Sequence, residues 1–450
     1  MHGTPGVDGL TPALYRELVD RYGSPLFVYD GATLLASLDA LVGALPPPVE
    51  VFYSLKANPN VTLTGLLAAH GARAEVSSLA ELQTALRAGV CARDIIFLGP
   101  GKSRQELAAC LDARIYAIVA ESFDELRTLD RMAGDAGVRP RVLVRVNPAT
   151  APPGARLAMG GKPRQFGIDE NELLAAGDLP ARYPDLYLAG VHVYLGTRIL
   201  DPAVVVANTR HVLDLAERVA GTTGIELAAV DVGGGLGVAY FDREQDPDLD
   251  ELRTGMRAAV EPFLDRYPDV RLLFEAGRFL AAPAGVYVVR VGTVKRSLGR
   301  WFAVTDGGTH HHMAAVGIGS IIQRNFPVRA LTRPGEPATE RYWLTGPLCT
   351  PNDVIAAGAE LPELAPGDLI GILRSGAYGP TASPGLFLGH GFPAEVLVHA
   401  GRSYLIRYRD ELEDVLRKQI HHQFTPAAGR PRAASGPQRS GHAPAAPAAR

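Results

Sequence analysis

The feature that most constrains the fold of this chain is a regular alternation of short apolar runs with amphipathic stretches over its first two thirds. The runs are rich in β-branched and aromatic residues, as in VFYSL and IIFL, and the stretches between them place apolar residues at helical spacing. Strands that alternate with helices are typical of a parallel sheet, and eight of them are typical of a closed (β/α)8 barrel. We therefore predict an α/β protein with a TIM barrel over residues 30–282, with strands at 51–55, 74–76, 95–98, 115–119, 142–146, 186–193, 227–232 and 270–274.

Three of the expected helices begin with a serine that is followed three residues later by a glutamate. In this pattern the serine hydroxyl accepts a backbone N–H of the first turn, and the glutamate reaches back to the serine N–H. Each pair follows a predicted strand closely, which favours a strand–loop–helix unit. The pairs are Ser78 with Glu81, Ser103 with Glu106, and Ser122 with Glu125.

The pattern changes after about residue 282. Runs such as GVYVVRV, RYWLTGP and AEVLVHAGRSYLIRY are β-rich and are separated by glycine and proline, which predicts an antiparallel C-terminal β domain over residues 283–415. We expect the N-terminal segment, residues 1–29, to pack with this domain. Residues 426–450 are mainly Ala, Pro, Arg, Gly and Ser without periodicity, so we predict a disordered tail there.

The composition disfavours several classes of protein. Charged residues make up 21% and the formal net charge is -3, which gives no reason to expect nucleic acid or an anionic membrane as a partner. No apolar run is long enough to cross a bilayer, and the first residues lack a signal-peptide pattern. The 3 cysteines are too scattered for a disulfide framework or a zinc site. We therefore expect a cytoplasmic protein.

Chemically unusual residues gather where the predicted strands end. In a parallel barrel the carboxyl ends of the strands share one rim, and reactive side chains lie there. The first, sixth, seventh and eighth predicted strands each end in such residues, so we expect them to converge on one site. They are Lys56, His192, Tyr194, Gly233, Gly234, Gly235, Glu275 and Arg278.

Each of these features has a functional and a simpler explanation. Three consecutive glycines let a backbone approach a phosphate, but they also suit a tight turn that needs positive φ. A rim lysine is usually a solvated charge; because an apolar strand leads directly into Lys56, we expect desolvation to lower its pKa and to favour the nucleophilic neutral amine. Glu275 either pairs with Arg278 or faces the pyridine nitrogen of a cofactor and keeps it protonated.

Six motifs, in order along the chain, resemble those of the alanine-racemase-like (fold type III) pyridoxal-phosphate decarboxylases. This family includes ornithine and diaminopimelate decarboxylases. The resemblance extends from about residue 25 to about residue 409 and implies a pyridoxal 5'-phosphate cofactor and a carboxy-lyase that decarboxylates an amino acid. The motifs are YSLKAN, GVHVYLGT, DVGGGLG, EAGR, GPLCTPND and SGAYGPTAS.

The resemblance also implies a role for each matching residue. Lys56 binds the cofactor as a Schiff base, Glu275 faces the pyridine nitrogen, and Tyr194 stands where a histidine usually stacks on the ring. Glu75 lies near the lysine, and Arg145 either anchors the ring or only pairs on the rim. The phosphate is held by the remaining set, Thr197, Gly233, Gly234, Gly235, Gly277, Arg278 and Tyr378.

The cysteine in GPLCTP matches the proton donor of the family, which reaches the site from a second subunit. The resemblance therefore implies that Cys349 returns a proton to the substrate carbon after CO2 has left, and that the protein is a homodimer with shared active sites. Lys56 and Cys349 are the predicted catalytic residues. Outside such a motif, a lone cysteine is more often a small buried hydrophobe.

One departure from the family pattern bears on the substrate. Diaminopimelate and ornithine enzymes carry an acid after the catalytic cysteine that binds the far ammonium of the substrate, whereas this chain has Thr350 there. Leaving a buried ammonium unpaired is costly. The motifs DGGTHHH, RNFP and MGGKPRQFGID resemble instead decarboxylases of natural-product and exosortase-associated gene clusters, of which the best understood act on a glutamyl group tethered to an acyl carrier protein.

We therefore predict a carrier-protein-bound glutamyl substrate and an acyl carrier protein as a partner. The consecutive histidines at 310–312 lack ligand spacing, so we expect them to line the pocket and predict no metal. Three alternatives stay open: a diaminopimelate or other free amino-acid decarboxylase, a racemase on the same scaffold, and a non-catalytic pyridoxal-phosphate-binding protein. The predicted substrate contacts are His192, Arg278, His312, Thr350 and Asp353.

Overall fold

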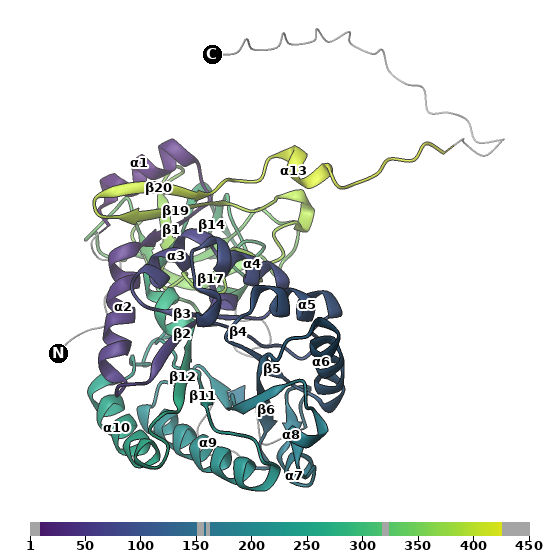
Figure 1. Cartoon of the computed structure of the whole chain (residues 1–450). Helices are drawn as coiled ribbons and strands as arrows, with labels where there is room; N and C mark the ends of the chain where they lie inside the picture. Colours follow the sequence, from purple (N-terminus) through teal and green to yellow (C-terminus); the bar gives the residue numbers. More distant parts are fainter. Residues whose placement is uncertain (1–9, 151–156, 159–162, 317–323, 425–450) are drawn as a thin grey trace.

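The chain folds into a helix-clad barrel and a β domain above it (Figure 1). The computed structural model describes residues 10–150, 157–158, 163–316 and 324–424. The predicted disordered tail, 426–450, lies outside the described residues. No helix in the described part of the chain is both long enough and apolar enough to span a membrane.

The barrel is confirmed. Its strands pair in parallel in the order β5–β4–β3–β2–β12–β11–β9–β6, and β5 pairs with β6 to close the ring. An apolar cluster contributed by these strands, including Phe52, Val119 and Leu273, fills its interior. The strands are β2 (Glu50–Ser54), β3 (Arg73–Val76), β4 (Ile95–Phe97), β5 (Ala117–Ala120), β6 (Arg141–Asn147), β9 (Tyr187–His192), β11 (Ala229–Gly234) and β12 (Arg271–Ala276), with the short β7 (Leu157–Ala158), β8 (Ile168–Asp169) and β10 (Gly196–Thr197) beside them.

Helices surround the barrel because each buries its apolar face against the strands, as the predicted periodicity requires. They form the outer ring in Figure 1. They are α2 (Gly31–Ala44), α3 (Val61–Ala69), α4 (Leu79–Arg87), α5 (Arg104–Ala113), α6 (Phe123–Ala136), α7 (Glu170–Leu174), α8 (Leu179–Arg182), α9 (Pro202–Thr223), α10 (Leu249–Arg266) and α11 (Arg278–Ala281), with single turns of 3-10 helix at Leu55–Ala57, Ala92–Asp94 and Ala282–Ala284.

All three predicted serine caps form, but only one makes the full reciprocal box. On α5 the Ser103 hydroxyl accepts the Glu106 N–H and the Glu106 carboxylate accepts the Ser103 N–H. On α4 the Glu81 carboxylate instead accepts the N–H of Ser77, one residue before the cap, at 2.8 Å. Glu125 on α6 does the same with the residue before its own cap. The signature therefore located each helix start correctly.

The C-terminal β domain is confirmed, but its sheet is mixed instead of purely antiparallel. β1 (Leu26–Asp30) lies antiparallel to β13 (Gly285–Ser297) and parallel to β19 (Ala394–His399), and β14 (Arg300–Thr305) lies parallel to β16 (Glu340–Thr345). Parallel neighbours need long connections, and residue patterns identify strands without identifying their neighbours. The other elements are β15 (Val328–Ala330), β17 (Val354–Leu361), β18 (Leu369–Ile372), β20 (Arg402–Arg407), α1 (Pro12–Tyr22), α12 (Met313–Val316) and α13 (Leu412–Leu416).

The β domain is joined to the barrel beside the turn that carries Lys56. The Tyr378 N–H donates to the Ala57 carbonyl at 2.7 Å, and the Asn58 side-chain amide donates to the Gly376 carbonyl at 3.0 Å. Tyr378 holds a left-handed backbone, with φ 55°, which is uncommon outside glycine. A segment far along the sequence is thereby held against the carboxyl end of the first barrel strand.

Candidate active site

Lys56 lies in the 3-10 turn that follows β2, between two carboxylates from the neighbouring strands. Its Nζ atom is 3.0 Å from Glu75 Oε2 at the end of β3 and 3.9 Å from Glu275 Oε2 at the end of β12. The Tyr194 ring centroid lies 5.5 Å from the same nitrogen. Adjacent parallel strands bring their carboxyl ends together, so residues 219 positions apart in the sequence, 56 and 275, surround one amine.

The expectation that Lys56 has a lowered pKa is wrong for this structure. Burial does disfavour the charged amine, but the carboxylates of Glu75 and Glu275 outweigh it and raise the pKa of Lys56 above its ordinary value. The side chain also keeps 37% of its surface exposed, so solvent still supports the charge. Lys56 is therefore an ammonium at neutral pH and must give up a proton before it can act as a nucleophile.

Glu275 is held as a carboxylate at the base of the site. Its Oε1 accepts a hydrogen bond from His192 Nε2 at 2.8 Å, and both residues are buried. Burial alone would raise the pKa of Glu275, but the nearby Lys56 ammonium and the His192 hydrogen bond lower it to about 2. The other oxygen, Oε2, accepts no hydrogen bond from the part of the chain that the structure describes. The structure thus gives His192 a contact with Glu275, and its predicted substrate contact stays a prediction.

Asp231, on β11, completes this buried cluster and was missed by the sequence analysis. One ligand-type atom from each of His192, Asp231 and Glu275 lies within 4.8 Å of the others. Burial and the neighbouring Glu275 carboxylate raise the pKa of Asp231 well above its ordinary value, which favours its neutral form. The signal was present: an acid in the apolar run AVDVGG, two positions before the first glycine, is unusual.

The three glycines have a packing reason as well as a predicted ligand role. A Cβ on Gly234 would lie 1.8 Å from the Glu275 carbonyl oxygen, and one on Gly235 would lie 2.0 Å from the Gly196 carbonyl oxygen. Gly233 and Gly235 also have positive φ, at 69° and 91°. The tight-turn explanation therefore holds for the triplet, and its contact with a phosphate stays a prediction.

Arg278 lies under Tyr378 and beside Tyr240, a second residue that sequence reasoning missed. The Arg278 Cζ atom is 4.5 Å from the Tyr378 ring centroid, and Nη1 donates to Tyr240 Oη at 3.2 Å. Tyr240 follows the glycine triplet in GLGVAY, and nothing in that spacing indicates contact with the next strand. Arg278, Tyr378 and Gly235 of the glycine turn therefore line one cavity, and their contact with a phosphate stays a prediction.

The cavity next to Lys56 is small because side chains fill it. We call it the Lys56 cavity; its volume is about 20 Å³, which is roughly the room for one water molecule. Tyr194 and Thr197 both line it, and burial raises the pKa of Tyr194 to about 12. Most of the predicted cofactor residues line it. The exceptions are Glu75, Arg145, Gly233 and Gly234.

Arg145 was expected either to anchor the cofactor ring or to form an ion pair on the rim, and the structure shows the ion pair. Arg145 Nη1 lies 2.8 Å from Glu121 Oε1, and both side chains are buried. Glu121, at the end of β5, also accepts the backbone N–H groups of Gly99 and Gly167 at 2.9 and 3.2 Å. Arg145 is therefore part of a network that ties three loops of the rim together, and a contact with the cofactor ring stays a prediction.

Of the predicted residues of the β domain, Tyr378 lines the Lys56 cavity, whereas Cys349 and the predicted substrate contacts do not. Cys349 is exposed in the turn between β16 and β17, with the half-buried Thr350 beside it. Asp353 is buried, and its two oxygens accept the N–H groups of Thr309 and Leu348 at 2.8 Å each. His312 is buried and its Nε2 lies 2.8 Å from Ser375 Oγ. The pocket-lining position expected of the histidines is not observed at the Lys56 cavity.

A lysine at the first strand end of a (β/α)8 barrel, set between two carboxylates and beside an aromatic ring, is the arrangement of a barrel enzyme that holds a cofactor on an amine. Residues 32–282 match the model of the pyridoxal binding domain of pyridoxal-dependent decarboxylases. The chain belongs to the pyridoxal-dependent decarboxylase family, and it is a carboxy-lyase whose cofactor is pyridoxal phosphate.

Individual relatives match nearly the whole chain. It is 36% identical over 407 residues to the L-glutamyl-[BtrI acyl-carrier protein] decarboxylase of Niallia circulans, covering 90% of this chain and 95% of that protein. It is 33% identical over 400 residues to the diaminopimelate decarboxylase of Pseudomonas aeruginosa, covering 88% and 93%. The structure of diaminopimelate decarboxylase from Helicobacter pylori complexed with L-lysine matches with a TM-score of 0.79 at 29% identity, covering 90% and 98%.

The residues around Lys56 fit pyridoxal phosphate. The charged Glu275 has a free buried oxygen that suits a protonated pyridine nitrogen. Arg278 Nε is buried without an acceptor, and the amides of Gly235 and Leu236 donate no hydrogen bond to any other described residue, so a phosphate there would satisfy several donors. Because the cavity is small, side chains that line it have to move to admit the ring.

Proposed function

We propose that this chain removes the α-carboxylate of an L-glutamyl group held as a thioester on a carrier protein. The observation that carries the proposal is the turn GPLCTPND, residues 346–353. Its one acid, Asp353, is buried with both oxygens taken by backbone N–H groups, so the turn offers no carboxylate to a distant ammonium. Thr350 follows the cysteine instead, which suits a substrate whose far end is a neutral thioester. The identity with the carrier-protein decarboxylase supports the same substrate.

The chemistry of the substrate determines its attachment. The α-carboxylate has to be free because it is the group that leaves, so the thioester joins the carrier to the side-chain carboxyl of glutamate. The bond between Cα and the carboxylate breaks, CO2 departs, and a proton replaces it on Cα. When bound, pyridoxal phosphate supplies an electron sink for the pair that the departing CO2 leaves behind.

The residues of the barrel prepare the amine and the charge of the site. Glu75 Oε2 is the nearest acceptor for the proton that the Lys56 ammonium must lose, at 3.0 Å. The hydrogen bond from His192 orients Glu275 and stabilises its negative charge. The second oxygen of Glu275 remains able to contact a cationic partner. Asp231 is buried beside Glu275, and its raised pKa disfavours a second negative charge there. Tyr378, tied to Ala57, covers Arg278 and excludes water from that end of the site.

The proton that replaces CO2 comes from the Cys349 thiol, and the thiolate regains a proton from solvent. Cys349 is exposed and absent from the lining of the Lys56 cavity of its own chain. We therefore propose, with the family resemblance as support, that it serves the site of a second copy in a homodimer. Each active site then needs residues from both chains.

A substrate panel tests the proposal. Purified enzyme with pyridoxal phosphate is offered the γ-glutamyl thioester of a carrier protein, free diaminopimelate, free ornithine and free glutamate. We expect CO2 release, and loss of one CO2 by mass spectrometry, with the carrier-bound substrate only. Rapid turnover of free diaminopimelate with none of the thioester would establish the alternative of a free amino-acid decarboxylase. Loss of the α-hydrogen without CO2 would establish a racemase.

A further inference from the structure

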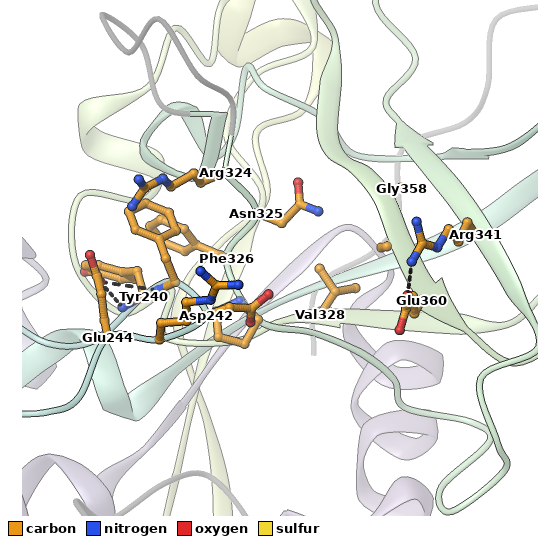
Figure 2. Close-up of a pocket in the computed structure, with 14 residues that line it drawn as sticks. Tyr240, Asp242, Glu244, Arg324, Asn325, Phe326, Val328, Arg341, Gly358 and Glu360 are labelled. Carbon is orange, nitrogen blue, oxygen red and sulfur yellow. Dashed lines mark hydrogen bonds and ion pairs between the residues drawn. The ribbon is translucent and has the colours of Figure 1, made fainter.

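A much larger cavity lies next to Tyr240, the residue that accepts a hydrogen bond from Arg278. None of the residues assigned to the decarboxylation lines this cavity. We call it the Tyr240 pocket; its volume is about 780 Å³. Figure 2 shows Arg324 and Phe326 on one side of it, with Arg341 and Glu360 joined to each other on the other side. Residues 240–244, which follow the glycine turn, and 324–328, which lead into β15, supply most of its wall.

The pocket and the Lys56 cavity are separated by a single layer of side chains. Arg278 lines the Lys56 cavity, and its Nη1 donates to the hydroxyl of Tyr240, which lines the pocket. Tyr240 in turn stacks on Phe326, with ring centroids 4.2 Å apart. A ligand long enough to extend from the Lys56 cavity past Arg278 would therefore meet the stacked rings of Tyr240 and Phe326.

Two arginines in the pocket have charges that no carboxylate of a described residue neutralises. Arg243 and Arg324 make no ion pair with any described residue; Arg324 lies over the Phe241 ring at 5.5 Å. The other lining charges are largely committed. Arg341 is paired with Glu360, and Glu244 accepts the N–H groups of Tyr240 and Phe241. Asp242 is the one lining acid that forms no hydrogen bond or ion pair with a described residue.

We propose that the Tyr240 pocket binds the phosphopantetheine arm of the carrier protein, with Arg243 and Arg324 on its phosphate. This inference rests on the proposed function. The aromatic wall suits the largely apolar, amide-bearing arm, and a guanidinium is the preferred partner of a phosphate because it offers parallel N–H donors. The pocket is large enough for such an arm, whereas the Lys56 cavity is not.

The experiment is a cycle of substrate and enzyme variants. The holoenzyme is assayed with the γ-glutamyl thioesters of phosphopantetheine and of pantetheine, which differ only in the phosphate, and with the carrier-bound substrate. We expect removal of the phosphate to lower kcat/KM of the natural enzyme by about tenfold, the effect of losing charge-assisted hydrogen bonds. In the Arg243→Ala, Arg324→Ala double variant the same removal should change kcat/KM by less than about twofold.

Two further variants sharpen the test. Asp242→Asn removes a carboxylate next to the anion and should raise kcat/KM for the phosphorylated substrate; a cation subsite would give the opposite sign. Arg210→Ala removes an exposed arginine on α9, away from the pocket, and should leave the phosphate effect at its natural size.

The outcomes separate this inference from the proposed function. A phosphate effect that persists in the double variant overturns the inference and leaves the proposed function standing. Equal turnover of both thioesters by the natural enzyme does the same. Absence of turnover of any thioester, in an enzyme that decarboxylates free diaminopimelate, overturns both.

Discussion

The Lys56 cavity and the Tyr240 pocket lie on either side of Arg278, and they differ in almost every physical respect. The first has about 20 Å³ of space and two carboxylates, those of Glu75 and Glu275, within 4 Å of one amine. The second has about 780 Å³ and carries two arginines, Arg243 and Arg324, that form no ion pair with a described residue. Catalysis depends on charged groups that the protein holds in fixed positions, whereas ligand binding depends on charged groups that have no partner within the protein. Substitutions around the Lys56 cavity should therefore change kcat, whereas substitutions in the Tyr240 pocket should change substrate binding.

The largest effect is expected for Lys56→Ala. Loss of the amine should lower kcat by at least about a thousandfold and abolish the visible absorbance of the bound cofactor. Lys295→Ala, which removes an exposed lysine on β13, is the matched control and should retain both activity and absorbance. Normal absorbance in the Lys56 variant would show that another amine holds the cofactor.

Cys349→Ala tests whether the Lys56 cavity is completed by a second chain. General acid catalysis is worth about a hundredfold or more, so kcat should fall by that amount. Mixing this variant with Lys56→Ala under conditions of subunit exchange should restore about a quarter of the natural activity, because half of the dimers then carry one intact site. Cys91→Ala, at another exposed cysteine, is the control. No recovery on mixing would mean that Cys349 serves its own chain.

Asp231→Asn tests the charge balance beneath Lys56. The pKa of Asp231 is raised in the folded protein, so its contribution to stability is lost as pH rises above the unfolded value of about 4. Asparagine mimics the neutral acid and should raise the free energy of unfolding by about 1–2 kcal/mol at pH 7, with the gain vanishing below about pH 4. Glu275 behaves oppositely: its pKa of about 2 gives stability that is present above pH 4 and lost towards pH 2.

Urea unfolding at pH 7 and pH 4 measures this difference. Asp135→Asn, at an exposed acid on α6, should show no such dependence. An Asp231→Asn variant that is less stable than the natural protein at pH 7 would mean that Asp231 is ionised in the folded state, which contradicts the electrostatics inferred for the site.

The smallest effect is expected for the arginines of the Tyr240 pocket. Because Arg243 and Arg324 are exposed and unpaired among the described residues, replacing either by alanine should change the free energy of unfolding by no more than about 0.5 kcal/mol. Phe326→Ala in the same pocket removes a buried ring stacked on Tyr240 and should cost about 3 kcal/mol. A large loss from either arginine variant would assign it a structural role.

The residues that could be predicted were those at strand ends. Lys56, Glu275 and the glycine triplet each follow an apolar run, and the barrel rule alone places such positions on one rim. Asp231 could have been found from its place inside the run AVDVGG, whereas Tyr240 and Glu121 could not. Their importance depends on which side chain of another strand they meet, and no local pattern carries that information.

The sequence by itself determined the barrel, the position of the reactive amine and the family, because periodicity and motif spacing are local properties that the chain carries wherever it folds. Only the tertiary structure decided the protonation state of Lys56, the parallel pairing of β1 with β19, and the large pocket behind Arg278. Each of these depends on distances between residues far apart in the chain, and electrostatic and packing energies are functions of those distances.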